Sequence, residues 1–578
     1  MDYKKIYQDW LENPYFDQET KAELKAIAED EKEIEERFYR DLEFGTGGLR
    51  GVIGAGTNRM NIYTVRRATQ GFGEYLAESV ENAKAKGVVI AYDSRHKSPE
   101  FAEEAALVLC ANGIKAYLFD ALRTTPELSF AVRELGCAGG IVVTASHNPP
   151  EYNGYKVYGE DGGQLVPEDA EKVIDKIQQI HDYSKVPYLP KQEALDKGLL
   201  KIIGEDIDKK YIEQVKSLVL RPEIIGQTGE DFKVIFTPLH GTGNMAVRRA
   251  LAEAGFKNVY VVAEQELPDP NFSTVKSPNP EEHEAFTLAL SLAKTIKPDV
   301  IIGTDPDCDR IGAVVQNKQG NYEVLTGNQT GALLIDYILS AMQEKKQLPD
   351  NGVVVKTIVT SEMGAAIAKS YGMTALDTLT GFKFIGEKIK QFEATGEKQF
   401  VFGYEESYGY LAGTFVRDKD AVIAALLICE MAAFYKTKGM TLYDALLSLF
   451  EKHGYYQEGL ASITLKGKEG MEKITDILKQ LRMNPPKAVG DKSLKLLRDY
   501  GQRIEYHLLE DREEVLTLPQ SDVLHFTMVD GSWFCVRPSG TEPKIKIYFS
   551  VIGKSLEDAK SQLQALKDGV MAIINGML

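Results

Sequence analysis

Short apolar runs that end in polar or glycine-rich loops constrain the fold of this 578-residue chain more than any other feature. Each run is rich in Val and Ile and is followed by a loop and then by a helical pattern, which is typical of parallel α/β domains. The five clearest runs read GVVIAYDSR, CAGGIVVTASHNP, DFKVIFTPLHGTG, PDVIIGTDPDCDR and GVVVKTIVTSE. We therefore expect an α/β fold built on parallel sheets.

The length of the chain and a change in its pattern predict four domains. At about 150 residues per domain, a chain of this length exceeds a single core. The units that begin near Gly87, Asp231 and Gly352 share one order of strand, loop and helix, either because they are related or because any α/β unit has this order. From about residue 451, short strands mix with helices and predict an α+β domain. The predicted domains are 1–210, which starts with an amphipathic helix over 18–43, then 211–325, 326–450 and 451–578.

Composition and charge exclude several classes of protein. The longest apolar segment, 421–434, is shorter than the roughly 18 residues of a membrane span and contains Glu430, so it predicts a buried helix. The opening residues MDYKKIYQDW lack the apolar stretch of a signal peptide and predict a cytoplasmic protein. A formal net charge of −17 argues against a nucleic-acid-binding surface. The chain has 5 cysteines and no CxxC pair, which predicts reduced thiols.

The segment TASHNP places Ser146 in a turn stiffened by prolines, directly after a predicted strand. In parallel sheets the carboxyl ends of the strands form the edge where ligands bind. Adjacent side chains such as Ser146 and His147 seldom face each other as in a catalytic triad, so the segment alone is either an ordinary polar loop or a nucleophile. Lys156 follows closely and offers a general acid/base or a phosphate contact.

Three carboxylates, Asp305, Asp307 and Asp309, follow another predicted strand in the segment GTDPDCDR. At every second position of an extended loop they point the same way, and three like charges in one place favour a cation with hard oxygen ligands such as Mg²⁺. A calcium-binding EF-hand needs glycine and glutamate where this chain has Arg310 and Gln316, so that alternative fails. Arg310 is placed to reach a phosphoryl group at the metal.

Two further segments offer groups that bind sugars and phosphates. In GYEES, Glu405 and Ser407 are able to hold neighbouring sugar hydroxyls, although the segment alone is also compatible with an ordinary loop. In RPSGTEPK, a guanidinium, two hydroxyls and a glycine turn predict a phosphate clamp. The residues of this clamp are Arg537, Ser539, Gly540 and Thr541.

Smaller basic sites complete the candidates. Arg50 lies in a glycine-rich loop, the segment Asp93–Arg95 follows a strand end, and Lys383 lies in another loop. His240, in LHGTG, is predicted to order its loop rather than to catalyse, because most histidines are structural.

In their order along the chain, TASHNP, GTDPDCDR, GYEES and RPSGTEPK resemble the motifs of the α-D-phosphohexomutase superfamily, over about residues 40–550. The resemblance implies three topologically similar α/β domains and a C-terminal α+β domain around a central cleft. It implies that Ser146 carries a phosphoryl group and, with Asp305, Asp307 and Asp309, binds one Mg²⁺. The other implied site residues are Lys156, His147 and Arg310 for catalysis, and Arg50, Lys383, Glu405, Ser407, Arg537, Ser539, Gly540 and Thr541 for substrate binding.

The resemblance also implies a reaction in two transfers. Phosphoserine gives its phosphoryl group to a sugar, and the bound bisphosphate turns and returns its other phosphate to Ser146. The Glu-Glu-Ser form of the sugar loop is similar to that of glucose-selective members, so we expect glucose 1-phosphate and glucose 6-phosphate as substrates and glucose 1,6-bisphosphate as intermediate and activator. No nucleic acid or membrane partner is expected, and monomer and dimer both stay open.

Several alternatives remain at this stage. Tyr404 and the segment GNQTG over 327–331 are similar to a branch that contains phosphopentomutases, which leaves phosphopentomutase and phosphomannomutase as alternatives. A magnesium-dependent phosphatase with Asp305 as its nucleophile is an alternative from another enzyme class. A sugar-phosphate-binding protein without catalysis is the alternative outside enzymes.

Overall fold

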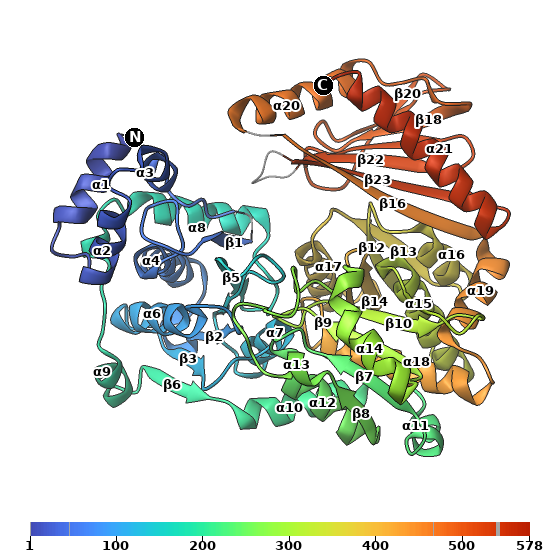
Figure 1. Ribbon diagram of the computed structural model, residues 1–578, viewed down its shortest axis with the longest axis horizontal. Helices are drawn as coiled ribbons and strands as arrows, with labels where there is room; N and C mark the ends of the chain where they lie inside the picture. The colour runs from blue at the N-terminus through green and yellow to red at the C-terminus, as the bar shows by residue number, and fades with distance from the viewer. Residues whose placement is uncertain (1, 46, 466, 539–543) are drawn as a thin grey trace. The chain divides into compact units, whose positions relative to one another are not determined.

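The computed structural model describes residues 2–45, 47–465, 467–538 and 544–578, without the side chains of 467–469 (Figure 1). The chain forms two compact units, Met1–Gly327 with Phe382–Leu442, and Asn328–Gly381 with Tyr443–Leu578. Among the described residues, no helix is both long and apolar enough to cross a bilayer.

Three short helices form the N-terminus, and the last two of them replace the single amphipathic helix predicted over 18–43, so that prediction is wrong. They are α1 (Tyr3–Glu12), α2 (Gln18–Ala26) and α3 (Glu31–Phe38). The helix breaks before α3 because the carboxylate of Asp30 accepts a hydrogen bond from the N–H of Glu33 over 3.1 Å and caps a new helix. Trp10 stacks on Phe16 at 4.2 Å and meets Phe38 edge-on, so a small aromatic core holds the three helices together.

A six-stranded sheet follows, in the order β1-β5-β4-β2-β3-β6. Its strands are β1 (Gly48–Val52), β2 (Val88–Tyr92), β3 (Ala116–Phe119), β4 (Gly139–Val143), β5 (Tyr152–Gly159) and β6 (Leu200–Ile203), and its helices are α4 (Ile62–Ser79), α5 (Ala83–Lys86), α6 (Ser98–Ala111), α7 (Thr125–Glu134), α8 (Pro167–Gln179) and α9 (Lys191–Asp196). Strands β2, β3, β4 and β6 run parallel, whereas β5 runs antiparallel to both of its neighbours, β4 and β1. The backbone of Gly139 faces Phe72 of α4, and that of Gly140 faces Val132 of α7. Because neighbouring strand residues point to opposite faces, α4 and α7 cover opposite sides of the sheet.

A five-stranded sheet in the order β11-β10-β9-β7-β8 repeats this arrangement. Its strands are β7 (Lys233–Thr237), β8 (Asn258–Val261), β9 (Val300–Thr304), β10 (Ile311–Gln316) and β11 (Tyr322–Val324), and its helices are α10 (Glu205–Ser217), α11 (Pro222–Thr228), α12 (Gly243–Ala254), α13 (Ala263–Glu266) and α14 (Thr287–Ile296). Strand β7 lies between two parallel neighbours, and β10 returns antiparallel to β9. In the first sheet, β2 likewise lies between two parallel neighbours and β5 returns antiparallel to β4. Strands β5-β4-β2-β3 of the first sheet and β10-β9-β7-β8 of the second therefore share a topology, whereas the outer strands differ.

The first unit ends with α17 (Phe382–Thr395), a hairpin of β14 (Gln399–Glu405) and β15 (Gly409–Ala412), and α18 (Ala421–Thr437). Residues 421–433 of α18 are all buried, which confirms the prediction of a buried helix over this apolar segment. Asp420 caps α18 with its carboxylate, which accepts hydrogen bonds from the N–H groups of Val422 and Ile423.

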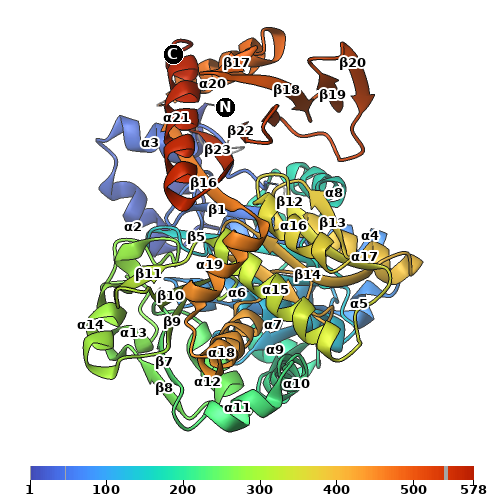
Figure 2. The same ribbon diagram turned by 90° about the vertical axis from the view of Figure 1, so that its right-hand side faces the viewer.

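The second unit contains a parallel pair of strands and a large antiparallel sheet (Figure 2). The first part comprises α15 (Gly327–Glu344), β12 (Gly352–Thr357), α16 (Glu362–Ser370), β13 (Thr374–Thr378) and α19 (Leu442–His453). The sheet comprises β16 (Tyr455–Thr464), β17 (Ala488–Val489), β18 (Lys492–Asp499), β19 (Ile504–His507), β20 (Arg512–Val515), β21 (Leu524–Met528), β22 (Trp533–Pro538) and β23 (Lys544–Gly553), with α20 (Gly467–Met483) and α21 (Leu556–Asn575). Helix α21 buries Leu566, Val570 and Ile574 in the core of this sheet. The predicted α+β character of the last part of the chain is confirmed.

Candidate active site

The turn after β4 holds Ser146 in a strained and buried position. Its φ of 50° lies in the left-handed region, which costs a residue other than glycine about 1–2 kcal/mol. The Ser146 N–H donates to Oγ1 of Thr144 over 2.9 Å. Its Oγ donates to Oδ2 of Asp305 over 2.6 Å and lies 3.1 Å from Nδ1 of His147. The predicted nucleophile is therefore fixed, and it faces a predicted metal ligand.

The turn between β9 and β10 gathers the three aspartates. Asp305, Asp307 and Asp309 are buried, and one oxygen of each lies within 4.8 Å of the others. The predicted extended loop is wrong: the N–H of Cys308 donates to the carbonyl of Asp305 over 3.0 Å, and Cys308 has a φ of 56°. A tight turn, rather than strand alternation, therefore brings the carboxylates together. Thr125 braces this turn, because its N–H and its Oγ1 both donate to Asp307 over 2.9 Å.

The aspartate triad fits a bound cation. Oδ1 of Asp307 and Oδ1 of Asp309 are buried and have no hydrogen-bond partner among the residues that the structure describes. Burial and the neighbouring charges of Asp307 and Asp309 raise the pKa of Asp305 well above its usual value. Carboxylate oxygens are the hard ligands that Mg²⁺ prefers. The residues that would hold Mg²⁺ are therefore Asp305, Asp307 and Asp309.

Two lysines lie against the triad. Nζ of Lys156 donates to Oδ2 of Asp307 over 2.8 Å and lies 3.5 Å from Oδ2 of Asp309. Burial alone would raise the pKa of Asp307, but the Lys156 ammonium group holds it below its usual value. Nζ of Lys419 lies 3.1 Å from Oδ2 of Asp309 and 3.0 Å from Oδ1 of Asp418. The site therefore combines a buried serine, two ammonium groups and the turn of the three aspartates, which fits a cation and is called the metal-binding turn below.

Arg310 joins the triad to the predicted sugar loop. Its Nη1 donates to Oε1 of Glu281 over 2.6 Å and to the carbonyl of Ser407 over 3.1 Å. Glu405 is buried at the end of β14, and its negative charge helps to raise the pKa of both Arg310 and Lys419. In each case the effect of burial, which alone would lower the pKa, is outweighed by nearby carboxylates. The sugar loop is thus placed beside the metal-binding turn.

Comparison with known families matches four consecutive segments of the chain to the domains of one family. Residues 41–184, 209–320 and 326–453 match phosphoglucomutase/phosphomannomutase alpha/beta/alpha domains I, II and III, and residues 478–566 match the C-terminal domain of the same family. The chain belongs to the phosphoglucomutase/phosphomannomutase family. The resemblance inferred from the four motifs is confirmed, and so is the four-domain α/β architecture.

Curated relatives cover almost the whole chain. The phosphoglucomutase of Staphylococcus haemolyticus (strain JCSC1435) is 39% identical over 530 residues, which are 92% of this chain and 94% of the relative. The phosphoglucomutase of Staphylococcus aureus (strain MSSA476) is 38% identical over 547 residues, 94% of this chain and 96% of the relative. As a member of this family, the chain is a phosphohexomutase, an intramolecular phosphotransferase.

Solved structures share the fold of this phosphohexomutase. A putative phosphomannomutase from Thermus thermophilus matches with a TM-score of 0.67 at 21% identity, over 93% of this chain and 99% of that one. The phosphoprotein parafusin, a phosphoglucomutase from Paramecium in its open form, matches with a TM-score of 0.67 at 17% identity, over 93% of this chain and 96% of that one.

The remaining predicted site residues of this family member are distributed over both units. Arg50, on β1, donates from Nη1 to Oδ1 of Asn148 over 3.1 Å and so lies beside the Ser146 turn. Burial and the charges of Arg310 and Arg50 lower the pKa of His147 well below its usual value. Lys383 is half-buried at the start of α17. Arg537 lies on β22 in the second unit, and Ser539, Gly540 and Thr541 lie outside the described residues.

His240 orders its loop, as the sequence predicts. Its Nδ1 lies 3.1 Å from the carbonyl of Leu267, and its Nε2 lies 2.8 Å from Oγ1 of Thr274. Next to it, Thr242 donates from N–H and from Oγ1 to the carbonyl of Pro306, in the metal-binding turn. The LHGTG loop therefore braces the turn that carries the three aspartates, through the hydrogen bonds from Thr242 to Pro306.

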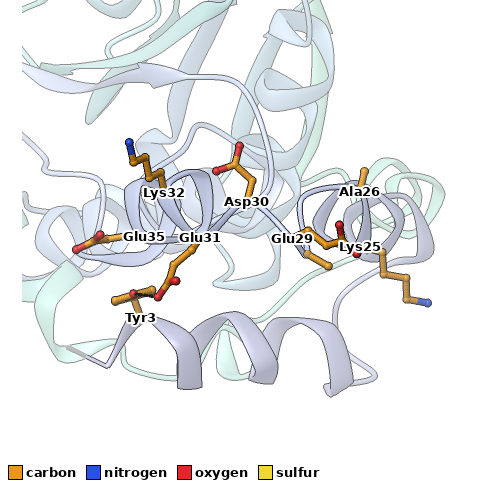
Figure 3. A pocket seen from close by; sticks show the side chains of 9 residues that line it. Tyr3, Lys25, Ala26, Glu29, Asp30, Glu31, Lys32 and Glu35 are labelled. Atoms are coloured by element: carbon orange, nitrogen blue, oxygen red, sulfur yellow. Dashed lines mark hydrogen bonds between the residues drawn. The ribbon is translucent and has the colours of Figure 1, made fainter.

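Two other features of the described residues do not fit the reaction. A solvent-open cavity of about 820 Å³ lies among the N-terminal helices, where carboxylates would repel an anionic sugar phosphate (Figure 3). The charged residues that line it are Lys25, Glu29, Asp30, Glu31, Lys32 and Glu35. A second acidic group, Glu505, His507 and Glu514 on β19 and β20, already pairs with Arg498 and Arg512.

Proposed function

We propose that this phosphohexomutase interconverts glucose 1-phosphate and glucose 6-phosphate through a phosphorylated Ser146 and a bound glucose 1,6-bisphosphate. The observation that carries the proposal is the hydrogen bond of 2.6 Å between Oγ of Ser146 and Oδ2 of Asp305, in a strained turn that faces the triad. A phosphoryl group on this oxygen would lie beside the proposed metal ligands. A serine that only stabilised a loop would not require this strained position.

The proposed reaction has two transfers with opposite directions. In the first, the bond between phosphorus and Oγ of Ser146 breaks, a bond from phosphorus to a sugar hydroxyl oxygen forms, and the proton of that hydroxyl passes to a base. In the second, Oγ of Ser146 takes the other phosphoryl group from the bisphosphate, and the sugar oxygen regains a proton. Lys156 is the proposed general acid/base, because its Nζ lies within hydrogen-bond distance of Asp307, in the triad that Oγ of Ser146 faces. His147 supports the serine at 3.1 Å.

Negative charge on the transferring group needs compensation in this buried place. When bound at Asp305, Asp307 and Asp309, Mg²⁺ would supply electrostatic stabilisation of the phosphoryl oxygens. Arg310 is held at the edge of the triad by Glu281 and the Ser407 carbonyl, so its guanidinium is pre-positioned for a phosphoryl group.

The substrate contacts of the proposed function come from several loops. Glu405 and Ser407 are proposed to hold sugar hydroxyls, and their place beside Arg310 supports this role. Arg50 and Lys383 are proposed phosphate contacts. Arg537, Ser539, Gly540 and Thr541 are proposed as the clamp for the phosphate that does not react, on the strength of the family motif.

Glucose is the proposed sugar because relatives that cover more than nine-tenths of the chain are named phosphoglucomutase. The Glu405-Glu406-Ser407 sequence supports the same choice. A coupled assay with the 1-phosphates of glucose, mannose, N-acetylglucosamine and ribose, each with bisphosphate activator and Mg²⁺, tests the proposal. We expect glucose 1-phosphate to give the highest kcat/KM. A dominant signal from ribose or mannose would contradict it, and release of inorganic phosphate without isomerisation would favour the phosphatase alternative.

A further inference from the structure

A buried arginine outside the reacting groups, Arg95, lies beneath the Ser146 loop. Its exposed fraction is 2%. Nη2 donates to the carbonyl of Ser146 over 2.6 Å and to the carbonyl of Asn148. Nη1 donates to the carbonyls of Pro149 and Tyr152 over 2.8 and 3.0 Å. One guanidinium group therefore holds four carbonyl groups of a single loop.

The partner of Arg95 holds the other side of the same serine. Oδ1 of Asp93 accepts from the N–H of Arg95 over 2.9 Å, and Oδ2 accepts from Oγ1 of Thr144 over 2.6 Å. Oγ1 of Thr144 in turn accepts from the N–H of Ser146 over 2.9 Å. The N–H and the C=O of Ser146 are thus both fixed by one connected network. Because Ser146 has a positive φ, its backbone keeps this conformation only where the surroundings impose it.

The second α/β domain covers the guanidinium group of Arg95. The ring of Phe272 lies over it at 4.9 Å, and Phe272 is 1% exposed. The segment that carries Phe272 is held at both ends by His240, through the carbonyl of Leu267 and Oγ1 of Thr274. The LHGTG loop that contains His240 also braces the metal-binding turn at Pro306. A chain of direct contacts therefore connects the metal-binding turn with the Ser146 loop through Arg95.

We propose that Arg95 is a positioning residue for phosphoryl transfer, which fixes Oγ of Ser146 toward the triad while it touches no reacting atom. The proposal rests on the proposed function of Ser146 as phosphoryl carrier. An arginine is required because a guanidinium group offers five N–H donors in a planar fork, whereas a lysine offers three donors around one nitrogen. The ring of Phe272 holds the guanidinium group of Arg95 in place.

The test compares Arg95→Gln, Arg95→Lys and a control, Arg67→Gln. Arg67 is a partly buried arginine of the same domain, but its guanidinium group binds Asp41 and the carbonyl of Ile177, away from the Ser146 loop. The first measurement is the single-turnover rate at which labelled phosphate passes from glucose 1,6-bisphosphate to each protein. The second is the split between kcat and KM for glucose 1-phosphate, with circular dichroism and thermal unfolding to report the folded fraction.

We expect Arg95→Gln to lower the single-turnover rate and kcat by about 100-fold, with KM changed less than about threefold, because a displacement of about 1 Å at the reacting atom has an effect of this size. Arg95→Lys should recover part of the rate, and Arg67→Gln should keep the wild-type rate per folded molecule. The proposal is overturned if Arg95→Gln transfers phosphate as fast as Arg67→Gln, or if its loss only follows the folded fraction.

Phe272→Leu decides the question if Arg95→Gln does not fold. This change keeps an apolar side chain but removes the aromatic face over the guanidinium group, and we expect a rate about 5- to 20-fold lower with an unchanged KM, since a displacement well below 1 Å has a smaller effect. A wild-type rate in folded Phe272→Leu would overturn the proposal. If the wild-type protein takes no label at Ser146, the proposed function is overturned as well. If the wild-type protein is labelled and Arg95→Gln is labelled at the same rate, only the role of Arg95 is overturned.

Discussion

Single side chains balance the charge of the buried metal-binding turn. Lys156 and Lys419 each place an ammonium group against a carboxylate of the triad. The sequence predicted Lys156 because it follows the serine segment closely. It did not single out Lys419, although Arg-Asp-Lys-Asp stands directly before a buried helix, because the contact with Asp309 depends on how the loop after β15 packs. The sequence did not single out Thr125 either, because its hydrogen bonds to Asp307 join residues far apart in sequence.

Removal of the Lys419 charge should strengthen metal binding. We expect Lys419→Met to tighten Mg²⁺ binding by about tenfold or more, because an ammonium group 3.1 Å from Asp309 opposes a cation there. Isothermal titration calorimetry with MgCl₂ measures this, and Lys438→Met, an exposed lysine after α18, is the matched control. An affinity equal to that of the wild type would show that Lys419 does not act on the triad.

Asp420 should make stability depend on pH. Burial raises its pKa to about 7, against about 4 in an unfolded chain. Its contribution to the free energy of unfolding is therefore fully present below about pH 4 and is lost as the pH rises through about 7. We expect Asp420→Asn, which imitates the protonated acid, to melt close to the wild type at pH 5 and above it at pH 8. A difference in melting temperature that is the same at both pH values, as expected for the exposed control Asp350→Asn, would contradict this.

Equivalent strand ends supply the three groups of the site. Ser146 follows β4, Asp305 follows β9 and Glu405 ends β14. Strands β4 and β9 each lie between one parallel and one antiparallel strand, and each of the three strands is followed in the chain by its antiparallel partner. The sequence predicted that the site lies at this edge of the sheets, because apolar runs end there in polar loops. A strand of a parallel sheet is buried on both faces, so its continuous apolar run is easily told apart from the polar loop that follows. It could not predict the helix break at Asp30 or the tight turn at Cys308, because caps and turns at single residues override periodicity.

Gly241 should support the metal-binding turn through its lack of a side chain. A Cβ added to Gly241 would lie 2.4 Å from Cα and 2.5 Å from the carbonyl oxygen of Pro306. We expect Gly241→Ala to displace the turn, to lower stability by about 1–3 kcal/mol and to weaken Mg²⁺ binding. Gly226→Ala, in α11, is the matched control because no atom lies within 4 Å of the added group. Unchanged Mg²⁺ affinity in Gly241→Ala would show that the LHGTG loop does not support the triad.

The whole chain carries a net charge of −17, yet its proposed substrates are anions. A negative net charge is compatible with an anionic substrate because cationic groups gather locally: Arg50, Lys156, Arg310, Lys383 and Lys419 belong to the first unit, and the proposed clamp residue Arg537 belongs to the second. Composition alone argued against nucleic acid as a partner for such a chain, but it could not locate this cluster. Of the residues in the first unit, only Arg310 lies in one of the four motifs; Arg50, Lys156 and Lys383 were separate candidates, and Lys419 was not predicted.

Metal binding should stabilise the whole protein. At a free Mg²⁺ concentration about 100 times the Kd, we expect a gain of about 2.7 kcal/mol in the free energy of unfolding and a higher melting temperature, because the folded triad binds the ion and the unfolded chain does not. Differential scanning calorimetry with and without EDTA measures the gain. Asp307→Asn should lose most of it, whereas Glu505→Gln, in the acidic group paired with arginines, should keep it. The reverse pattern would place the metal in the second unit.

The phosphorylation state of Ser146 during turnover tests the central claim most directly. We expect mass spectrometry after incubation with glucose 1,6-bisphosphate that carries ¹⁸O-labelled phosphates to find about one labelled phosphate per chain, on the peptide that contains Ser146. When unlabelled glucose 6-phosphate is then added, we expect unlabelled phosphate to replace the label on this peptide, because each cycle returns the other phosphate of the bisphosphate to the serine. Ser146→Ala should carry no phosphate and lose nearly all mutase activity, while Ser184→Ala, at an exposed serine in a short 3₁₀ helix, should keep both the phosphate and the activity. Phosphate at another residue, or mutase activity close to the wild type in Ser146→Ala, would contradict the account.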